Sequence, residues 1–158
     1  MGRIVVGVDG SRASMAALRW AVREARFRGA QVETVYVFEN TPSWRVYGYQ
    51  QETIEAEPDR SHQATLTSDE QSGAEAHGVV ERMVDDLDQL GEVGVESVIV
   101  EDRHPARVLV ERSADADMLV VGSRGHGGVS ELLLGSVSHH CATHAQCPVV
   151  IIRPGPSS

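Results

Sequence analysis

Short apolar segments rich in β-branched residues alternate along this chain with longer segments in which apolar residues recur at helical spacing. The apolar segments predict strands at 4–9, 32–38, 95–100, 117–122 and 148–153. Helical spacing predicts helices at about 13–28, 71–90 and 105–114, and a last helix that begins near residue 136. This alternation is typical of an open parallel sheet with helices on both faces, so we predict an α/β fold.

Right-handed crossovers leave few ways to connect five parallel strands, and we expect the strand order 3-2-1-4-5 of a Rossmann-like sheet. Strand order then reverses between the first and the fourth strands. Ligands of such sheets bind at the carboxyl ends of the strands beside this reversal. Those ends are Asp9, Gly10 and Ser11 after the first strand, and the segment that begins at Gly122. The two ends form one candidate site, in which Ser11 is also the expected N-cap of the first helix.

The stretch from about 39 to 72 does not follow the alternation. It is polar, contains two prolines and shows no sustained period. We predict a long loop or insertion inside a single domain that spans 1–158, because this length is usual for one domain. Its aromatic residues Trp44, Tyr47 and Tyr49 either cover a ligand or belong to a partly disordered flap, and the second interpretation is favoured.

Charge is distributed unevenly along the chain. The net charge is −9, and residues 52–101 contain fourteen acidic side chains against Arg60 and Arg82. A negative protein repels polyanions, so we expect no nucleic-acid partner. All fourteen cationic residues are arginine. This composition excludes mechanisms that need a phosphate-binding lysine, a lysine Schiff base or a lysine general base.

Cellular location is predicted from apolar runs and cysteines. No apolar run approaches the roughly 20 residues that cross a bilayer, and the first ten residues, MGRIVVGVDG, do not resemble a signal peptide. Cys141 and Cys147 form neither a CxxC pair nor a disulfide framework, which fits a reducing compartment. We therefore predict a cytoplasmic protein without a membrane partner, in which both cysteines are packing residues.

Glycines are concentrated directly after the fourth predicted strand. They are Gly122, Gly125, Gly127 and Gly128, and Gly135 with Ser136 stands at the expected start of the last helix. Glycine lets backbone N–H groups approach a phosphate closely, and a helix N-terminus adds unpaired donors and the positive end of a dipole. A flexible turn would have the same composition. The position beside the reversal of strand order favours the phosphate site.

Two common phosphate motifs are absent from the sequence. There is no GxxxxGK[ST] segment, so a P-loop NTPase is excluded. No GxGxxG follows the first strand, and the segment from Gly125 to Ser130 is a poor copy without the acidic residue after a following strand. An NAD-dependent dehydrogenase is therefore disfavoured.

The spacing Gly-x2-Gly-x9-Gly-Ser at Gly122, Gly125, Gly135 and Ser136 resembles the signature of the ATP-binding branch of the universal stress protein family. The start of the chain, IVVGVDGS, and its end, GSVSHHCATHAQCPVVIIR, are similar to the family's first strand and its last helix and strand. The resemblance covers nearly the whole chain except about 40–71.

The resemblance implies an adenine nucleotide, ATP or ADP or AMP, bound with Mg²⁺. It implies that the signature residues contact ribose and phosphates, that other loop residues line the site, and that Val137 and Ser138 extend its phosphate end. The loop residues are Ser123, Arg124 and His126. Asp9 matches the family aspartate near ribose and any bound metal. Val37 matches the position whose backbone meets adenine.

Two features depart from this picture or compete with it. The family often has glycine before the Pro-Ala pair that opens the third helix, where this chain has Arg103. That side chain either points outward or narrows the adenine pocket. His140 and His144 are spaced i,i+4 near His139, but no acidic residue of HExxH placement accompanies them, so surface or packing histidines are favoured over a metal site.

We expect a nucleotide-dependent sensor or regulator of the stress response with an as yet unknown protein partner. No catalytic set is assignable from spacing, so a dedicated enzyme is disfavoured, slow ATP hydrolysis stays open, and nucleotide-dependent group transfer is the weakest alternative. The main alternative is an interaction module without nucleotide that uses the acidic helix or the insertion. The last strand is expected at a sheet edge, where it pairs in a homodimer. A bulky residue at Gly122 or Gly135 is expected to abolish nucleotide binding and leave the fold intact.

Overall fold

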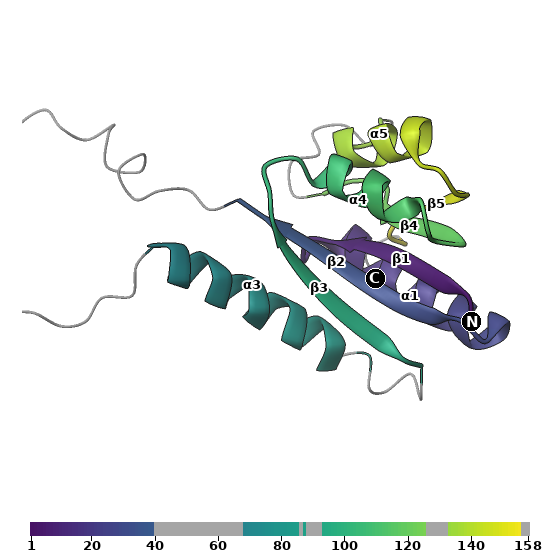
Figure 1. Cartoon of the computed structure of the whole chain (residues 1–158), viewed down its shortest axis with the longest axis horizontal. Helices are drawn as coiled ribbons and strands as arrows, with labels where there is room; N and C mark the ends of the chain where they lie inside the picture. Colours follow the sequence, from purple (N-terminus) through teal and green to yellow (C-terminus); the bar gives the residue numbers. More distant parts are fainter. Residues whose placement is uncertain (40–67, 86, 88–92, 126–132, 156–158) are drawn as a thin grey trace, which may run out of the picture.

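The computed structural model describes residues 1–39, 68–85, 87, 93–125 and 133–155, without the side chains of 68–72 and 84. Figure 1 shows the chain as a layer of strands between helices. The strands are β1 (Arg3–Val8), β2 (Gln31–Phe38), β3 (Val95–Glu101), β4 (Met118–Gly122) and β5 (Val149–Ile152). The helices are α1 (Arg12–Arg28), α3 (Ser68–Asp85), α4 (Pro105–Ser113) and α5 (Ser136–His144).

The five strands form one parallel sheet in the order β3-β2-β1-β4-β5, which confirms the predicted α/β fold and strand order. Val6 of β1 lies opposite Thr34 of β2 on one side and opposite Val120 of β4 on the other. The inner strands are buried on both faces, which explains why they read as continuous apolar runs. Strand order reverses between β1 and β4, so the carboxyl ends of these two strands meet at one crevice.

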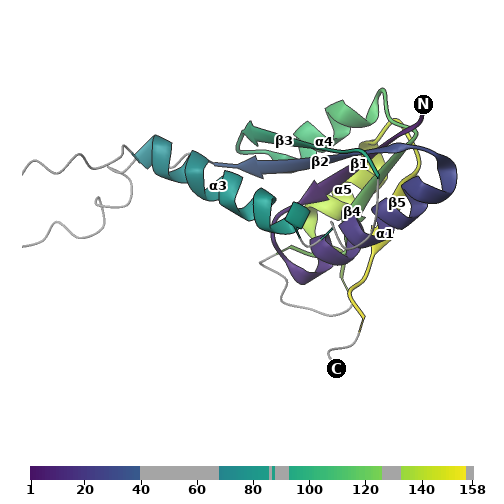
Figure 2. The same cartoon turned by 90° about the horizontal axis from the view of Figure 1, so that it is seen from below.

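Helices cover both faces of the sheet. Helices α1 and α3 lie on one face, as Figure 2 shows from below, and α4 and α5 pack on the other. The core under α1 and α3 includes Ile4, Val6, Leu18, Val32 and Met83. The core under α4 and α5 includes Val5, Val35, Leu109, Leu119 and Cys141. In the part of the chain that the structure describes, no helix has the length and apolar character needed to span a bilayer.

Helix α1 has clear local start and stop signals. The Ser11 hydroxyl accepts a hydrogen bond from the Ser14 N–H at 3.2 Å, which makes Ser11 the N-cap as expected. Gly10, just before it, has φ of 81°, a conformation that glycine adopts without strain. Gly29 ends the helix with φ of 64°. These signals fix where α1 begins, directly beside the carboxyl end of β1.

The predicted loop at 39–72 is wrong at its second boundary, because α3 already begins at Ser68. The first residues of this helix are polar in sequence, which is why the segment resembled a loop. The rest of the predicted loop, including the three aromatic residues, lies outside the described residues, as does the expected end of the helix at 88–90. A single domain spanning 1–158 stays a prediction.

Candidate functional site

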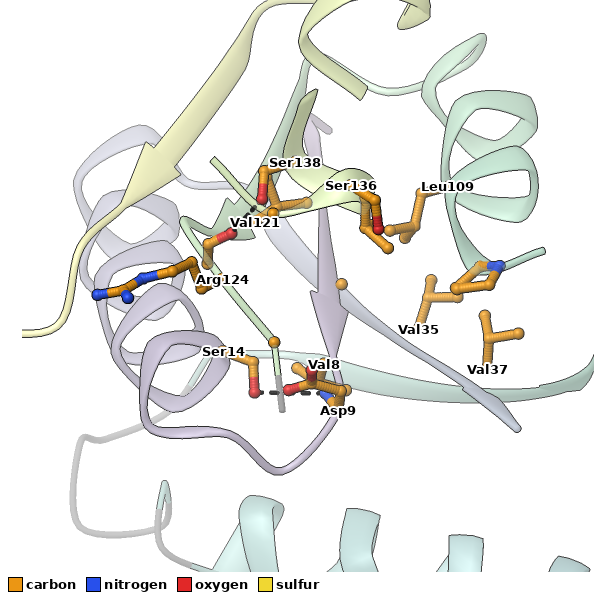
Figure 3. A pocket seen from close by; sticks show the side chains of 16 residues that line it. Val8, Asp9, Ser14, Val35, Val37, Leu109, Val121, Arg124, Ser136 and Ser138 are labelled. Atoms are coloured by element: carbon orange, nitrogen blue, oxygen red, sulfur yellow. Dashed lines mark hydrogen bonds between the residues drawn. The ribbon is translucent and has the colours of Figure 1, made fainter. Parts of the chain in front are cut away.

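A pocket of about 360 Å³ opens at the carboxyl ends of β1 and β4. Figure 3 shows that side chains of different character line its two sides. Its size is within the range of small-molecule sites, and its position beside the reversal of strand order is where ligands of such sheets bind. The pocket is therefore the candidate functional site.

One side of the pocket is apolar. Val35 and Val37 of β2 form this side together with Leu109 of α4 (Figure 3), and Pro105, the first residue of α4, also lines the pocket. Val35 and Leu109 are buried and belong to the core under α4. These side chains offer flat apolar contact without hydrogen-bonding groups, which suits the faces of an aromatic ring.

The opposite side begins at Asp9, the residue after β1 (Figure 3). The Asp9 carboxylate accepts a hydrogen bond from the Ser11 N–H at 2.9 Å, and the Asp9 N–H donates to the Ser14 hydroxyl at 3.3 Å. The start of α1 thus fixes the orientation of the carboxylate. A Cβ atom at Gly125 would lie 2.6 Å from Asp9 Oδ2, so a larger residue there would displace the Asp9 carboxylate from this position. Gly125 therefore leaves room for the carboxylate at the polar side of the pocket.

The N-terminus of α5 forms a third wall of the pocket. Gly135 is its N-cap and provides no side-chain capping bond, and Ser136, Val137 and Ser138 line the pocket as its first turn. The N–H groups of a first turn have no acceptor inside their own helix. They present partial positive charge to the pocket, to which the helix dipole adds. This wall can hold an anionic group such as a phosphate.

Gly122 also lines the pocket, but packing requires it independently of any ligand. A Cβ atom at Gly122 would lie 2.7 Å from the backbone carbon of Ala13 and 2.9 Å from the Ser14 nitrogen. A larger residue would push the first turn of α1 away from β4. The expectation that a bulky residue at Gly122 leaves the fold intact is therefore wrong. At Gly135 the nearest atom, Arg124 Cα, would be 3.3 Å away, and the backbone φ of −62° is open to any residue.

Most of the predicted site residues line the pocket. They are Asp9, Val37, Gly122, Arg124, Gly125, Gly135, Ser136, Val137 and Ser138. Gly10 and Ser11 do not line it and border a neighbouring hollow instead, together with Arg124 and Gly125. Ser123 is buried and absent from the lining. His126 lies outside the described residues.

Ser138 lines the pocket and also stabilises the local structure through its hydroxyl group. Its hydroxyl donates toward the carbonyl oxygens of Gly122 and Ser123, at 2.9 and 3.1 Å. The Gly135 N–H donates to the same Ser123 carbonyl at 2.8 Å. These bonds tie the start of α5 to the end of β4. The hydroxyl proton of Ser138 is thus engaged within the protein.

Sequence reasoning missed about half of the pocket lining. The missed residues are Gly7, Val8, Ser14, Val35, Pro105, Leu109 and Val121. Val35 precedes Val37 by two positions and therefore shares its face of the strand, a signal that could have found it. Pro105 and Leu109 contribute because α4 starts beside the pocket, which requires knowledge of how the helix packs. A Cβ atom at Gly7 would lie 2.7 Å from a methyl carbon of Leu109, so that glycine makes room for the apolar side.

Arg103 does not narrow the pocket. Its guanidinium lies 3.3 Å from the Glu39 carboxylate, its side chain is 55% exposed, and it is absent from the pocket lining. It belongs to a polar cluster at the surface that includes Asp102 and Arg107. The backbone N–H of His104 and the Arg107 guanidinium hold the pKa of the Asp102 carboxyl below its usual range. Of the two orientations left open for Arg103, the structure has the outward one.

The histidines and cysteines among the described residues form no second candidate site. Within 1–39, 68–85, 87, 93–125 and 133–155, no three His, Cys, Asp or Glu side chains are grouped to hold a metal ion. His140 and His144 stack with ring centroids 4.2 Å apart. Burial raises the pKa of the Cys141 thiol to about 11 and also raises the pKa of Cys147. Neither cysteine is therefore a thiolate nucleophile at neutral pH.

The chain matches a family model over residues 1–153, nearly its whole length, and that model describes the universal stress protein family. The chain belongs to the universal stress protein family. A universal stress protein of Mycobacterium tuberculosis is 33% identical over 150 residues, which are 95% of this chain and 45% of that protein. The chain spans about half the length of the curated relatives it matches.

Solved structures of universal stress proteins share the fold. One is a universal stress protein in complex with cAMP, with a TM-score of 0.66, 23% identity and coverage of 98% of each chain. Another is the Archaeoglobus fulgidus protein in complex with dAMP, with a TM-score of 0.64, 23% identity and coverage of 96% of this chain and 98% of that one. At 23% identity the likeness establishes the fold only. The ligand of this chain has to be inferred from the residues of its own pocket.

Proposed function

We propose that the pocket binds an adenine nucleotide, ATP in particular, and that this universal stress protein acts as a nucleotide-dependent sensor or regulator in the stress response. One observation carries the proposal. A single cavity places an apolar side, at Val37 and Leu109, opposite a polar side made of Asp9 and glycine-flanked backbone. A nucleotide has the same division between its base and its phosphates. The similar proteins with cAMP and dAMP support the choice of adenine.

In this proposal the base lies against the apolar side, near the backbone of Val37. The ribose lies between Asp9 and Gly122, and the phosphates lie against Gly125 and the first turn of α5. Arg124 also lines the pocket, but its guanidinium points away from the other lining side chains in Figure 3. Gly10 and Ser11 border the neighbouring hollow beside Arg124 and Gly125, and the buried Ser123 holds the loop through its backbone; their contact with the nucleotide stays a prediction.

The residues present also fit a magnesium ion bound together with a nucleotide. Mg²⁺ usually takes one or two protein carboxylates and completes its coordination with phosphates and waters. Asp9 is the one carboxylate among the described lining residues, and its orientation is fixed by the Ser11 N–H. When bound, the ion would neutralise phosphate charge. One carboxylate and one arginine are a small set for in-line attack by water, so we propose binding rather than rapid hydrolysis and leave slow hydrolysis open.

Calorimetric titration of nucleotide-free protein with ATP and with AMP, with and without Mg²⁺, tests the proposal. We expect saturable binding and an increase in Tm, because a ligand that binds only the folded state stabilises it. Gly135→Val brings a side chain between the start of α5 and Arg124 and is expected to weaken binding at least about tenfold, a loss of about 1.4 kcal/mol.

Gly155→Val is the matched control for that experiment, because no atom lies within 4 Å of a Cβ placed at Gly155. It should bind nucleotide as the unaltered chain does. Absence of both heat and thermal stabilisation in protein shown by mass spectrometry to carry no nucleotide would overturn the proposal. If Gly135→Val and Gly155→Val lost nucleotide affinity equally, the phosphates could no longer be assigned to the first turn of α5.

We further propose a homodimer that pairs through β5. This strand ends the sheet, so the peptide groups on its outer side have no neighbouring strand in the described structure. Pairing across a two-fold axis would satisfy them. Light scattering at micromolar concentration is expected to give twice the chain mass, and a monomer alone would contradict the pairing. A cytoplasmic location and an unknown protein partner also remain predictions.

A further inference from the structure

A second hollow, the acidic groove, lies between α3 and β3 and has a volume of about 610 Å³. Figures 1 and 2 both show α3 running alongside β2 and β3 at one edge of the sheet. Phe38 and Ile99, both partly exposed, give the groove apolar surface, and the buried Val80 also lines it. The carboxylates at its rim are those of Glu81, Asp85 and Glu101. The groove is thus apolar within and negative at its rim.

The rim carboxylates lack the ion pairs that other carboxylates of this chain have. Four carboxylates elsewhere form ion pairs with arginine: Glu24, Glu33, Glu39 and Asp102. Glu81, Asp85 and Glu101 are exposed, and the described residues provide no ion-pair partner for any of them. His77 is the one described lining residue able to carry positive charge. The groove therefore has uncompensated negative charge.

This charge argues against a second copy of the chain as the occupant. The groove carries three carboxylates, those of Glu81, Asp85 and Glu101, and His77 is its one described lining residue that can be positively charged. Two such surfaces facing each other would repel. The same charge attracts a cationic partner and discriminates against an anionic one.

The backbone beside the groove favours an extended partner. β3 is the edge strand opposite β5, and the described structure has no strand on its outer side. A peptide that adds a strand at such an edge gains main-chain hydrogen bonds, and its alternate side chains lie on one face. On the α3 face the neighbours of those side chains would be Ser97, Ile99 and Glu101, all of which line the groove. The edge of β3 therefore offers backbone hydrogen bonds to an extended peptide, and the acidic groove offers contacts to its side chains.

We propose that the acidic groove docks an extended cationic segment of a partner protein. Every second residue of the segment, on the side facing α3, is apolar or basic. Apolar residues of the segment pack on Phe38 and Ile99, and its arginine or lysine residues pair with Glu81 and Glu101. The interaction does not involve the nucleotide pocket, so it stands or fails independently of nucleotide binding.

The test uses the full chain and a fluorescein-labelled ten-residue peptide in which threonine alternates with valine or arginine. Fluorescence anisotropy is expected to show saturable binding that weakens from 50 to 300 mM NaCl, because salt screens exposed charges. Glu81→Lys and Glu101→Lys should each weaken binding at least about fivefold, since reversal replaces an attraction with a repulsion. A peptide with glutamate in place of arginine should not bind.

Glu111→Lys on α4 is the matched control. Glu111 is also exposed, and its substitution makes the same change of charge at a site away from the groove. It should weaken binding less than about twofold. Binding is also expected to shift the amide resonances of 97–101 in the ¹⁵N-labelled chain. Failure of the peptide to bind, equal losses from Glu111→Lys, or resonance shifts confined to β5 would each overturn the proposal. A change of oligomeric mass in Glu101→Lys would assign the groove to a second copy and also overturn it.

Discussion

The pocket beside β1 and β4 and the acidic groove beside β3 are hollows of the same sheet, but they are formed by different means. Glycines at the polar side of the pocket leave little room for an added side chain, since a Cβ at Gly122 would lie 2.7 Å from the Ala13 backbone carbon. Side chains form the groove, whose rim consists of the exposed carboxylates Glu81, Asp85 and Glu101. The pocket depends on the absence of side chains, and the groove depends on their charge.

This difference separates the two hollows in their sensitivity to substitution and to salt. Backbone that packs to van der Waals contact cannot accept an added side chain without moving, and interiors resist such movement. Exposed charges contribute little to stability and are screened by salt. Substitutions at the pocket should therefore affect folding strongly where packing is tight, and substitutions at the groove should affect partners much more than folding.

The largest effect is expected from Gly122→Val. Its Cβ would lie 2.7 Å from the Ala13 backbone carbon, so α1 must move away from β4. Overpacking of this kind costs about 3 kcal/mol of unfolding free energy. Gly135→Val should cost about 1 kcal/mol or less, because its nearest neighbour is at 3.3 Å and its φ of −62° is ordinary. Urea denaturation followed by circular dichroism measures both.

Gly155→Val again serves as the control and should match the unaltered chain, since the space around Gly155 is open. If Gly122→Val and Gly135→Val were equally stable, the start of α1 would be able to shift at little cost. The pocket would then be no more rigid than the groove, and the contrast between the two hollows would fail.

Most of the fold could be predicted from local sequence signals. Apolar runs gave the five strands, Ser11 and Gly29 marked the ends of α1, and handedness rules limited the strand order. The start of α3 was placed three residues late, because a polar first turn resembles loop composition. Local rules succeed where one element decides its own conformation.

The site could be predicted only where its residues are close in the sequence. Gly122, Gly125 and Gly135 were found by spacing, but spacing could not show that one of them is required by packing against α1. The apolar side was missed at Pro105 and Leu109, which reach the pocket through the packing of α4 on the sheet. The acidic groove was also beyond local reasoning, since it joins residues of α3 and β3 that only the tertiary structure brings together.

Two carboxylates, Glu33 of β2 and Glu101 of β3, allow a finer test of the comparison between the pocket and the groove. Glu33 in β2 has a side chain only 7% exposed, and its two oxygens lie 3.1 Å from an Arg3 nitrogen and 2.7 Å from an Arg112 nitrogen. Glu101 at the end of β3 is exposed and has no ion-pair partner among the described residues. The first carboxylate links β2 to β1 and α4, and the second contributes charge to the groove.

Glu33→Gln is expected to lower the free energy of unfolding by about 2 kcal/mol, because it leaves two partly buried guanidinium groups without their counter-charge. Glu101→Gln should change it by less than about 0.5 kcal/mol, with a small gain at low salt from reduced repulsion among the rim carboxylates. Urea denaturation of both variants at 20 and 500 mM NaCl distinguishes them. The effect at Glu101 should vanish at high salt, and the effect at Glu33 should largely remain, since buried pairs are screened less.

The direction of the Glu101 effect decides whether the groove carries uncompensated charge. A loss of stability in Glu101→Gln would mean that this carboxylate is paired within the protein, and the groove would then resemble the compensated surface around Glu33. A gain that disappears with salt would mean that the rim carboxylates repel one another in the free protein. Relief of that repulsion by a cationic segment would then add to its binding, which makes this smallest effect a measure of how far the groove is prepared for its partner.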